Sequence, residues 1–413
     1  MVQDIIRRAS SRFQQDGFAE LCRHAFNIGA NSILQKLLTR SEILLLTDEL
    51  RSRCKSGSLW TLDKQTYEPT ELLSFGNESG LKSSDGIRKK TWGFNQAFVA
   101  ELRQVVVLGS YALPVTCDGK IVSDAIHWDP HSDLFTNREM VRAVRATGVE
   151  LPFQFLEALG LPCSFRTLPT LECACVVRGR QGMNYYSWIL KNLARLRGVR
   201  KYEQETGDTV TLIVPPNLPE YAQETLRVLG YESQCFIWHG GPVQVDKLVV
   251  PSHPEPTPET IQWIQSVGRE LAPHAQQENK DTNRWIYISR QKAGRRRLKN
   301  YSEIVPVFER YDVTPIRCEE LTLEEQVRVF RDADGVIGIH GAGLTNVVWG
   351  EDLAVIEIFN NAGKTVYRNL SDVMGYKYDY VFAEPVQNVD AEINHDVVLN
   401  PDEIATAIES LQS

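Results

Sequence analysis

The sequence predicts an α/β protein of two domains, and three observations support this class. The chain has 413 residues, more than one ordinary domain usually holds. Its second half alternates short apolar segments with helical ones, which is typical of a doubly wound parallel sheet. A proline-rich stretch separates this half from the first. The composition, 42% hydrophobic and 24% charged, excludes a disordered or fibrous chain, and the net charge of −8 argues against a general nucleic-acid binder.

The first forty residues differ from the rest in charge. Residues 1–40 hold six Lys or Arg against three Asp or Glu, so they are basic within an acidic chain. Apolar residues recur there at roughly helical spacing, which predicts an amphipathic helical segment. Three roles are open for such a helix: docking on the body of the protein, contacts in a homodimer, or binding to an anionic membrane surface. Because the sequence shows neither a membrane-spanning run nor a signal peptide, we expect a cytoplasmic protein, with peripheral contact at the cytoplasmic membrane face.

Residues 41–250 are expected to form the first domain. The pattern before residue 123 is one of short strands with tight turns, including a hairpin at Asp118-Gly119. After residue 180 the pattern becomes helical again, and Gly230 supplies a helix end. The predicted elements are strands at 105–108, 112–116, 120–122 and 210–214, and helices at 184–197 and 221–229.

Residues 251–259 are expected to link the two domains. Four prolines fall within the eight residues from Pro251 to Pro258. Neither a helix nor a central strand tolerates that density, because proline lacks the backbone N–H that both structures use. The alternative is a rigid surface loop inside one domain.

Residues 260–413 are expected to form a second, Rossmann-like domain. Its apolar segments are short and nearly continuous, as buried parallel strands are. The last helix has the clearest start, with Asn400 as cap, Pro401 in the first turn and Glu403 three residues after the cap. The predicted strands are 285–289, 313–318, 335–339 and 354–359, and the predicted helices are 302–311, 322–331 and 344–349.

A turn of small residues follows the strand at 335–339. It reads His-Gly-Ala-Gly-Leu-Thr-Asn over residues 340–346 and leads into a helix. Glycine lets the backbone approach a ligand, and a helix amino terminus offers free N–H groups, so the turn suits a phosphate or diphosphate. Tight strand–helix turns also need glycine for steric reasons alone. The turn is neither Gly-x-Gly-x-x-Gly nor a Walker motif, so a nicotinamide-dependent oxidoreductase and a P-loop enzyme are not supported.

Two further features fall near the same edge of the predicted sheet. Arg290 ends the strand at 285–289, where ligands bind in such sheets, and its guanidinium can clamp phosphate oxygens. The run from Arg295 to Arg297 follows, either as part of this site or as a solvated basic loop. Glu357 lies inside an apolar strand, where a carboxylate is costly unless paired. It either forms a buried ion pair or accepts hydrogen bonds from ribose hydroxyls.

A polar loop in the first domain offers acid–base groups. Residues 127–133 read His-Trp-Asp-Pro-His-Ser-Asp, which suits a metal site, a catalytic acid or base, or a capped turn. We take Asp129 or His131 as the candidate catalytic base, with His340 as a second candidate. Asp332-Ala-Asp334 has the form of a metal-binding Asp-x-Asp, but its place between a helix and a strand favours a turn.

The stretch from Trp285 to Phe359 resembles glycosyltransferase family 61. The shared pattern is a strand ending in Ser-Arg, then Arg-Arg-x-x-Asn, Gln-Val on a helix, His-Gly-Ala-Gly-Leu-Thr-Asn and Glu-Ile. The resemblance implies a GT-B-like fold, that is, two Rossmann-like domains with a cleft between them, the first on the acceptor side and the second holding a nucleotide-sugar donor. It also implies inversion at the anomeric carbon. The donor-binding residues that we carry over or infer are Arg290, Arg296, Arg297, Asn300, His340, Gly341, Ala342, Gly343, Leu344, Thr345, Asn346 and Glu357.

The first half departs from the family pattern. Family members carry Tyr-His-Trp-Leu-x-Asp, whereas this chain has Ser187 and Lys191 at the histidine and aspartate positions. We therefore keep two hypotheses. The first is an inverting transferase that moves a sugar from a nucleoside diphosphate to a hydroxyl of a glycan, polysaccharide or lipid-linked acceptor, with no active-site metal and no cofactor. The alternative is a catalytically silent module that binds nucleotide or glycan.

Overall fold

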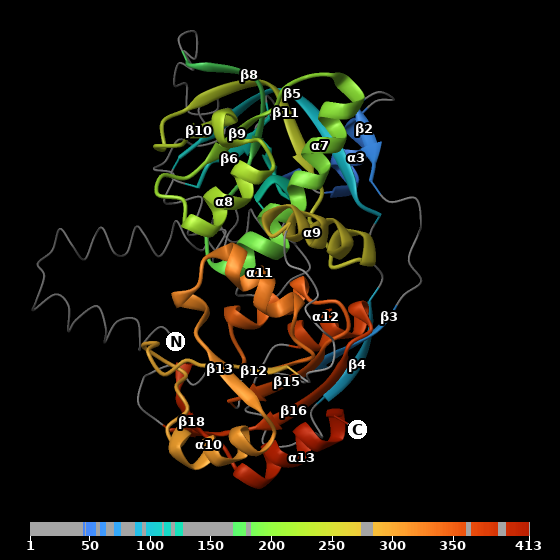
Figure 1. The fold of residues 1–413 in the computed structure, drawn as a ribbon. Coiled ribbons are helices and arrows are strands. Elements are labelled where there is room, and N and C mark those ends of the chain that lie inside the picture. The colour runs from blue at the N-terminus through green and yellow to red at the C-terminus, as the bar shows by residue number, and fades with distance from the viewer. Residues whose placement is uncertain are drawn as a thin grey trace, which may run out of the picture.

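Beside two small two-stranded sheets, the computed structural model contains two large β-sheets, one in each half of the chain (Figure 1). Helices α9 (Pro258–Leu271) and α11 (Leu323–Arg331) lie between them. The structure describes residues 44–45, 47–54, 58–62, 70–75, 87–92, 96–109, 111–116, 120–126, 168–178, 183–273, 284–360, 365–386 and 394–412.

The first sheet is mixed and has nine strands in the order β1-β7-β6-β5-β11-β8-β9-β10, with β2 also paired to β5. Its strands are β1 (Leu44–Leu45), β2 (Leu59–Thr61), β5 (Phe98–Leu108), β6 (Leu113–Val115), β7 (Ile121–Val122), β8 (Thr170–Val176), β9 (Thr211–Val214), β10 (Cys235–Ile237) and β11 (Val243–Pro251). Strands β8 to β11 run parallel to one another, while β5 runs antiparallel to β11. The first half is therefore Rossmann-like only in its parallel part.

A long helix, formed by three consecutive segments, covers one face of this parallel part. It comprises α6 (Tyr185–Ser187), the π-helical η3 (Trp188–Leu193) and α7 (Ala194–Thr206). Arg195 fastens it to the sheet, because its guanidinium donates to the carbonyls of Val176 and Pro251, where β8 and β11 end. The helix runs nine residues beyond the predicted end at 197 and stops at Gly207, whose φ of 75° suits a left-handed cap. The other helical elements of this half are α3 (Thr47–Arg53), η2 (Asp124–Ile126), α8 (Glu220–Val228) and η4 (Glu232–Gln234).

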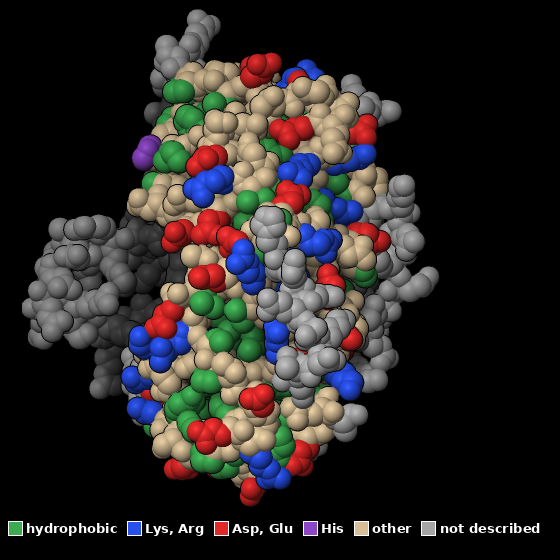
Figure 2. Space-filling view, viewed as in Figure 1, with side chains coloured by type: hydrophobic (Ala, Val, Ile, Leu, Met, Phe, Trp, Pro, Cys, Tyr) green, Lys and Arg blue, Asp and Glu red, His purple; other side chains and the backbone are tan. Residues whose placement is uncertain are grey.

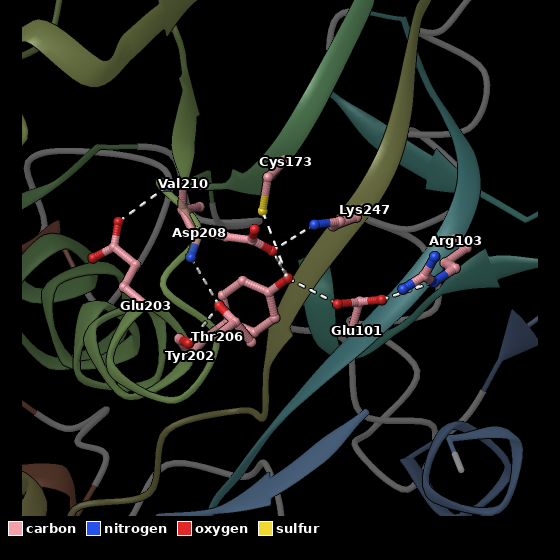
Figure 3. Close-up of polar contacts among 9 residues, drawn as sticks. All are labelled: Glu101, Arg103, Cys173, Tyr202, Glu203, Thr206, Asp208, Val210 and Lys247. Atoms are coloured by element: carbon pink, nitrogen blue, oxygen red, sulfur yellow. Dashed lines mark hydrogen bonds and ion pairs between the residues drawn. The ribbon is translucent and has the colours of Figure 1, made fainter. Parts of the chain in front are cut away.

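A polar network sits where α7 ends on the sheet (Figure 3). The hydroxyl of Tyr202 lies 2.8 Å from Glu101 Oε2 and 2.9 Å from Asp208 Oδ2. Each carboxylate also has a cation, since Arg103 binds Glu101 at 2.9 Å and Lys247 binds Asp208 at 2.7 Å. Tyr202 is fully buried, so these partners satisfy a hydroxyl that would otherwise be costly inside the protein. The network joins α7 to β5 and β11.

The second sheet has five parallel strands in the order β13-β12-β14-β15-β16. The strands are β12 (Trp285–Ile288), β13 (Val313–Ile316), β14 (Gly335–Ile339), β15 (Ala354–Phe359) and β16 (Lys377–Phe382). From β12 the chain first moves to one side, to β13, and then returns to the other side, to β14. This is the doubly wound order in which ligands bind at the point of reversal, here between β12 and β14. The Rossmann-like prediction agrees with this sheet.

Helices cover both faces of the second sheet, as a parallel sheet requires. Helices α10 (Tyr301–Arg310) and α13 (Pro401–Gln412) pack against each other on one face, while α11, α12 (Val366–Met374) and the 3-10 helix η6 (Ala342–Trp349) lie on the other. Helix α11 starts with a capping box in which Thr322 and Glu325 bond reciprocally. The remaining elements are η5 (Cys318–Glu320), β17 (Glu384–Val386), β18 (Asp396–Val398), and the hairpin β3 (Thr70–Phe75) with β4 (Ile87–Trp92).

The proline-rich segment leads directly from β11 into α9, whose first turn begins at Pro258 with Thr257 as cap. Helix α9 contacts α7 and α8 of the first half and α11, α12 and η6 of the second. One buried apolar cluster accordingly runs from the first sheet to the second, and includes Val249, Ile264 and Trp349. The helical segment predicted at residues 1–40 lies outside the described residues. The GT-B-like arrangement with a cleft, and the domain boundaries, remain predictions.

Candidate functional site

The carboxyl ends of β12 and β14 meet at the point where the second sheet reverses direction. Arg290 follows β12 and His340 follows β14, and the two strands are hydrogen-bonded neighbours. Figure 2 shows Lys and Arg side chains gathered at one edge of the half that carries these strands. Sheets of this order bind ligands beyond the carboxyl ends of the strands where the order reverses, so the position after β12 and β14 alone marks the candidate site.

Two guanidinium groups converge at the turn after β14. A Cβ placed on Gly341 would lie 3.3 Å from Nη1 of Arg290 and 3.3 Å from Nη1 of Arg296. Arg296 also donates to the carbonyl of His340 at 2.6 Å, and Arg290 donates to the carbonyl of Arg295 at 3.2 Å. Glycine at 341 is thus what leaves room for both cations beside the backbone.

Neither arginine of this pair is neutralised within the described part of the chain. The Nε of Arg290 and the Nε of Arg296 are buried and find no hydrogen-bond acceptor there. Burial, together with the positive charge of Arg295, lowers the pKa of Arg290; burial and the charges of Arg290 and Arg295 lower the pKa of Arg296 to about 10. Partly buried cations that lie beside each other are stabilised by an anion placed between them. The electrostatics of this site therefore favour a negatively charged group.

The backbone at Arg296 is held in an unusual conformation. Its φ of 56° lies in the left-handed region, which side chains other than glycine rarely adopt and which costs about 1–3 kcal/mol. This turn folds the arginine loop back so that its guanidinium reaches His340. Strain of this kind persists only where the surrounding structure enforces it, and it is most common at active and binding sites.

His340 and Glu357 form a buried pair behind this turn. Nδ1 of His340 lies 2.5 Å from Oε1 of Glu357, and the hydroxyl of Tyr378 donates to Oε2 at 2.7 Å. Glu357 is completely buried, and His340 is 8% exposed. The buried partner that the sequence analysis expected for Glu357 is therefore His340.

The other glycines of the turn have a packing role. A Cβ on Gly338 would lie 2.9 Å from Leu344, and one on Gly343 would lie 3.1 Å from Ile288. Ala342 begins η6, and Thr345 lies 3.3 Å from the hydroxyl of Tyr367, which also donates to the Gly341 carbonyl. The steric interpretation of the motif thus holds at Gly343, whereas Gly341 leaves room for the two guanidinium groups and ligand access there remains a prediction.

Asn346, the last residue of the motif, binds protein groups. Its side-chain oxygen accepts from Tyr185 of the first half and, at 3.0 Å, from Nε1 of Trp349, while its nitrogen donates to Gln326 at 2.9 Å. Asn346 is fully buried. The structure therefore places it between the two halves, with its amide occupied by protein groups.

Arg297 and Asn300 also have protein partners. Arg297 binds the buried carboxylate of Asp396 through Nε at 3.0 Å and Nη2 at 2.8 Å. Asn300 exchanges two hydrogen bonds with the backbone of Leu399, at 2.8 and 3.0 Å. These contacts anchor the arginine loop to the chain before α13. Of the predicted donor residues, the structure brings together Arg290, Arg296, His340 and Gly341 at the reversal point.

The first half approaches this site through α6. The ring of Tyr186 lies edge-on to Tyr367 with centroids 6.3 Å apart, and Tyr367 in turn lies 5.5 Å from the ring of His340. Lys191 stands over the Tyr186 ring, with Nζ 5.7 Å from its centroid. Ser187 is buried, and its backbone N–H is capped by Asn184. Tyr186 and Tyr367 were missed in the sequence, because their proximity depends on a contact across 181 residues.

The candidate bases Asp129 and His131 lie outside the described residues. Within the ranges that the structure describes, no group of three or more His, Cys, Asp or Glu side chains could hold a metal ion. In the same ranges no helix has the length and apolar character to cross a membrane. Asp334, just before β14, accepts a hydrogen bond at 2.8 Å from the backbone N–H of Arg284, just before β12.

Comparison with known families addresses the expected resemblance directly. The model of the family described as Glycosyltransferase 61 matches residues 183–356. This stretch is therefore similar to glycosyltransferase family 61, and we call it the family 61 segment. The family 61 segment begins just before α6 and ends in β15, so it contains Arg290, Arg296, His340 and Gly341 and stops one residue before Glu357.

Two curated relatives agree with the family 61 segment. An EGF domain-specific O-linked N-acetylglucosamine transferase from Drosophila melanogaster is 32% identical over 98 residues, which are 23% of this chain and 19% of that protein. Its namesake from Gallus gallus is 30% identical over 89 residues, 20% of this chain and 17% of that protein. The matches thus span about a fifth of the relatives' length. They support a glycosyltransferase, as the family does.

Proposed function

We propose that this protein is an inverting glycosyltransferase whose donor is a nucleoside-diphosphate sugar. The single observation that carries the proposal is the pair of guanidinium groups, Arg290 and Arg296, that meets at Gly341 where the sheet reverses. A diphosphate offers several anionic oxygens, and arginine binds such oxygens through paired hydrogen bonds. The two Nε–H groups that lack acceptors among the described residues are donors for such a ligand.

In the proposed reaction the acceptor hydroxyl attacks the anomeric carbon as the diphosphate leaves from the opposite face. Arg290 and Arg296 stabilise the charge that develops on the leaving oxygens, a contribution that is often the largest in such reactions. A base on the acceptor side takes the hydroxyl proton. Asp129 and His131 remain the candidates for that base. We propose that the two arginines neutralise the diphosphate without a metal ion.

The names of the relatives suggest the first donor sugar to test. Both are N-acetylglucosamine transferases by name, so the corresponding nucleotide sugar is the first choice. We propose a hydroxyl acceptor on a glycan, polysaccharide or lipid-linked molecule, and include EGF-domain proteins in the panel because the relatives act on them by name. A homodimer and membrane contact through residues 1–40 are part of the proposal. Flotation with anionic liposomes, with and without residues 1–40, tests the membrane contact.

Nucleotide binding is tested by thermal unfolding with a panel of nucleoside mono- and diphosphates, with and without chelator. A ligand at 100 times its Kd should stabilise the protein by about 2.7 kcal/mol. We expect one diphosphate to stabilise it, with or without chelator, and Arg290→Ala to abolish the shift. Arg269→Ala is the matched control, because Arg269 is exposed on α9. No shift with any nucleotide would contradict the donor site.

The competing function is a catalytically silent binding module, favoured by Ser187 and Lys191 at positions where the family carries histidine and aspartate. Lys191 lies over Tyr186, which contacts Tyr367 beside the site, so the substitution falls close to the reaction. Consumption of the nucleotide sugar separates the two functions. Turnover with any acceptor supports the transferase, whereas binding without turnover across the panel supports the module.

A further inference from the structure

Glu357 is a buried carboxylate with both oxygens occupied. Oε1 lies 2.5 Å from Nδ1 of His340, and Oε2 accepts from the hydroxyl of Tyr378 at 2.7 Å. None of the residue is exposed. Burying an unpaired carboxylate is costly, so these two partners are needed to stabilise it. Because the side chain has no exposed surface, hydroxyl groups of a ligand do not reach it directly. Its accessible partner is His340, so Glu357 acts on any ligand through that imidazole.

The imidazole of His340 is held in one orientation. One face stacks on Phe359 with ring centroids 5.8 Å apart, and Tyr367 packs edge-on at 5.5 Å. With Nδ1 bonded to Glu357, Nε2 is the remaining nitrogen, and 11% of the side chain is still exposed. A carboxylate on one imidazole nitrogen fixes the tautomer and stabilises the ring when the other nitrogen is also protonated.

The position of His340 determines which reacting group it can serve. Its carbonyl accepts from Arg296, and the next residue is Gly341, over which Arg290 and Arg296 converge. The backbone of His340 therefore adjoins the place proposed for the diphosphate, and its ring packs against Tyr367, whose hydroxyl donates to the carbonyl of Gly341. In an inverting displacement the acceptor hydroxyl attacks from the opposite face of the sugar. A group beside the diphosphate serves the leaving oxygen and does not reach the attacking one.

We propose that His340 is the proton donor to the leaving diphosphate, positioned by Glu357 and Tyr378. This inference rests on the proposed function. As the bond between the anomeric carbon and the phosphate oxygen breaks, its electron pair passes to that oxygen, and the Nε2 proton of His340 follows. The acceptor hydroxyl forms the new carbon–oxygen bond and loses its proton to the base on its own side. The base then passes its proton to solvent and solvent returns one to Nε2, so both groups are restored. The one proton released overall is the one that the protonated diphosphate loses to solvent after it leaves.

The test compares His340→Ala with the exposed His239→Ala as control, using the nucleotide sugar and two nucleophiles. General acid–base catalysis contributes about 10²–10⁴-fold, so we expect kcat to fall by this factor in His340→Ala. Azide, which needs no base, should be transferred just as slowly by this variant, because the leaving group is still unassisted. Stabilisation by the nucleoside diphosphate should persist in His340→Ala, which would show that the donor site is still folded.

Glu357→Gln tests the positioning role. It keeps a hydrogen bond to His340 but removes the charge, so we expect kcat to fall while KM for the donor stays unchanged; Tyr378→Phe should have a smaller effect in the same direction. Recovery of the His340→Ala rate with azide would overturn the proposal, since it would place His340 on the acceptor's proton. A wild-type rate in His340→Ala would overturn it as well. If the wild-type protein itself turns over no donor, the proposed function fails before the variants are compared.

Discussion

The hydroxyl of Tyr185 donates a hydrogen bond to the side-chain oxygen of Asn346, 161 residues further along the chain. Tyr185 opens the long helix of the first half, and Asn346 belongs to the turn motif of the second. Nε1 of Trp349 donates to both partners, at 3.1 Å to the tyrosine and at 3.0 Å to the asparagine. This three-residue contact fastens the proposed donor turn to the half that faces it.

Tyr185→Phe removes the hydroxyl and leaves the ring. Because Trp349 still donates to Asn346, neither partner is left without a hydrogen bond, so the loss should cost about 0.5–1.5 kcal/mol. We expect the midpoint of thermal unfolding to drop by a small but measurable amount. Tyr311→Phe is the matched control, because that hydroxyl binds Glu409 at the surface and should matter little. Equal shifts in the two variants would argue against a special role for the contact.

Substitution by alanine should affect nucleotide binding at Arg296 and stability at Arg297. Arg296→Ala removes a cation with an unsatisfied Nε, so we expect nucleoside diphosphate binding to weaken by about 10- to 100-fold, as for a charged hydrogen bond worth about 1.5–3 kcal/mol. Arg297→Ala leaves the carboxylate of Asp396 buried with Lys299 at 3.6 Å, so thermal stability should fall while nucleotide affinity is retained. Titration calorimetry and thermal unfolding of both variants separate the two effects. Equal losses of affinity would contradict this division.

The pair of Asp208 and Lys247 should make stability depend on pH. The hydrogen bond from Lys247 lowers the pKa of Asp208, and the hydrogen bond to Asp208 raises the pKa of Lys247. The stability from Asp208 is therefore present above its ordinary pKa of about 4 and is lost as pH falls through the lowered value. The stability from Lys247 is present below about 10.4 and is lost as pH rises through the raised value.

Asp208→Asn and Lys247→Met test this pair. At pH 7 each should lower stability by about 1 kcal/mol, as for a partly exposed ion pair. Between pH 5 and 3 the unfolding midpoint of Asp208→Asn should decline less steeply than that of the wild type. The double variant should lose no more than either single one, because both remove the same interaction. Additive losses would show that the two side chains act independently.

The neighbouring strand leaves room only for glycine at position 335. A Cβ there would lie 2.2 Å from the ring of Trp285, its register partner on β12, and Trp285 is itself buried. Gly335→Ala should therefore destabilise the sheet by about 1–3 kcal/mol, as overpacking does. Gly294→Ala is the control, since its Cβ would meet nothing within 4 Å. Denaturant unfolding of the two variants measures the difference.

The second sheet was predictable because its signals are local. Strand β14 begins and ends where expected, at 335 and 339, because a fully buried parallel strand reads as an uninterrupted apolar run. Helix α11 begins one residue after its predicted start, since Thr322 and Glu325 form the capping box. The first sheet was predicted only in pieces. Its central pair, β5 and β11, joins residues about 140 positions apart, and no local pattern reports such a pairing.

In the candidate site, too, features with local sequence signals were predicted and those that depend on long-range contacts were not. Arg290 and Gly341 were identified because their positions at strand ends follow from the pattern of apolar runs. The partners of Arg297 and Asn300 could not be foreseen, since Asp396 and Leu399 lie 99 residues further on. The pairing of Glu357 with His340 was anticipated only as a buried ion pair, because the register of β14 and β15 decides which side chain it meets.

The apolar cluster that runs from one sheet to the other determines whether the two halves can fold and unfold separately. Helix α9 contributes to it Ile261, Ile264 and Val267, and Trp349 joins it from beneath the donor turn. Cutting the chain in the proline-rich segment would expose this interior on both fragments. We therefore expect neither fragment to be soluble when expressed alone, and calorimetry of the intact chain to show one cooperative melting transition rather than two.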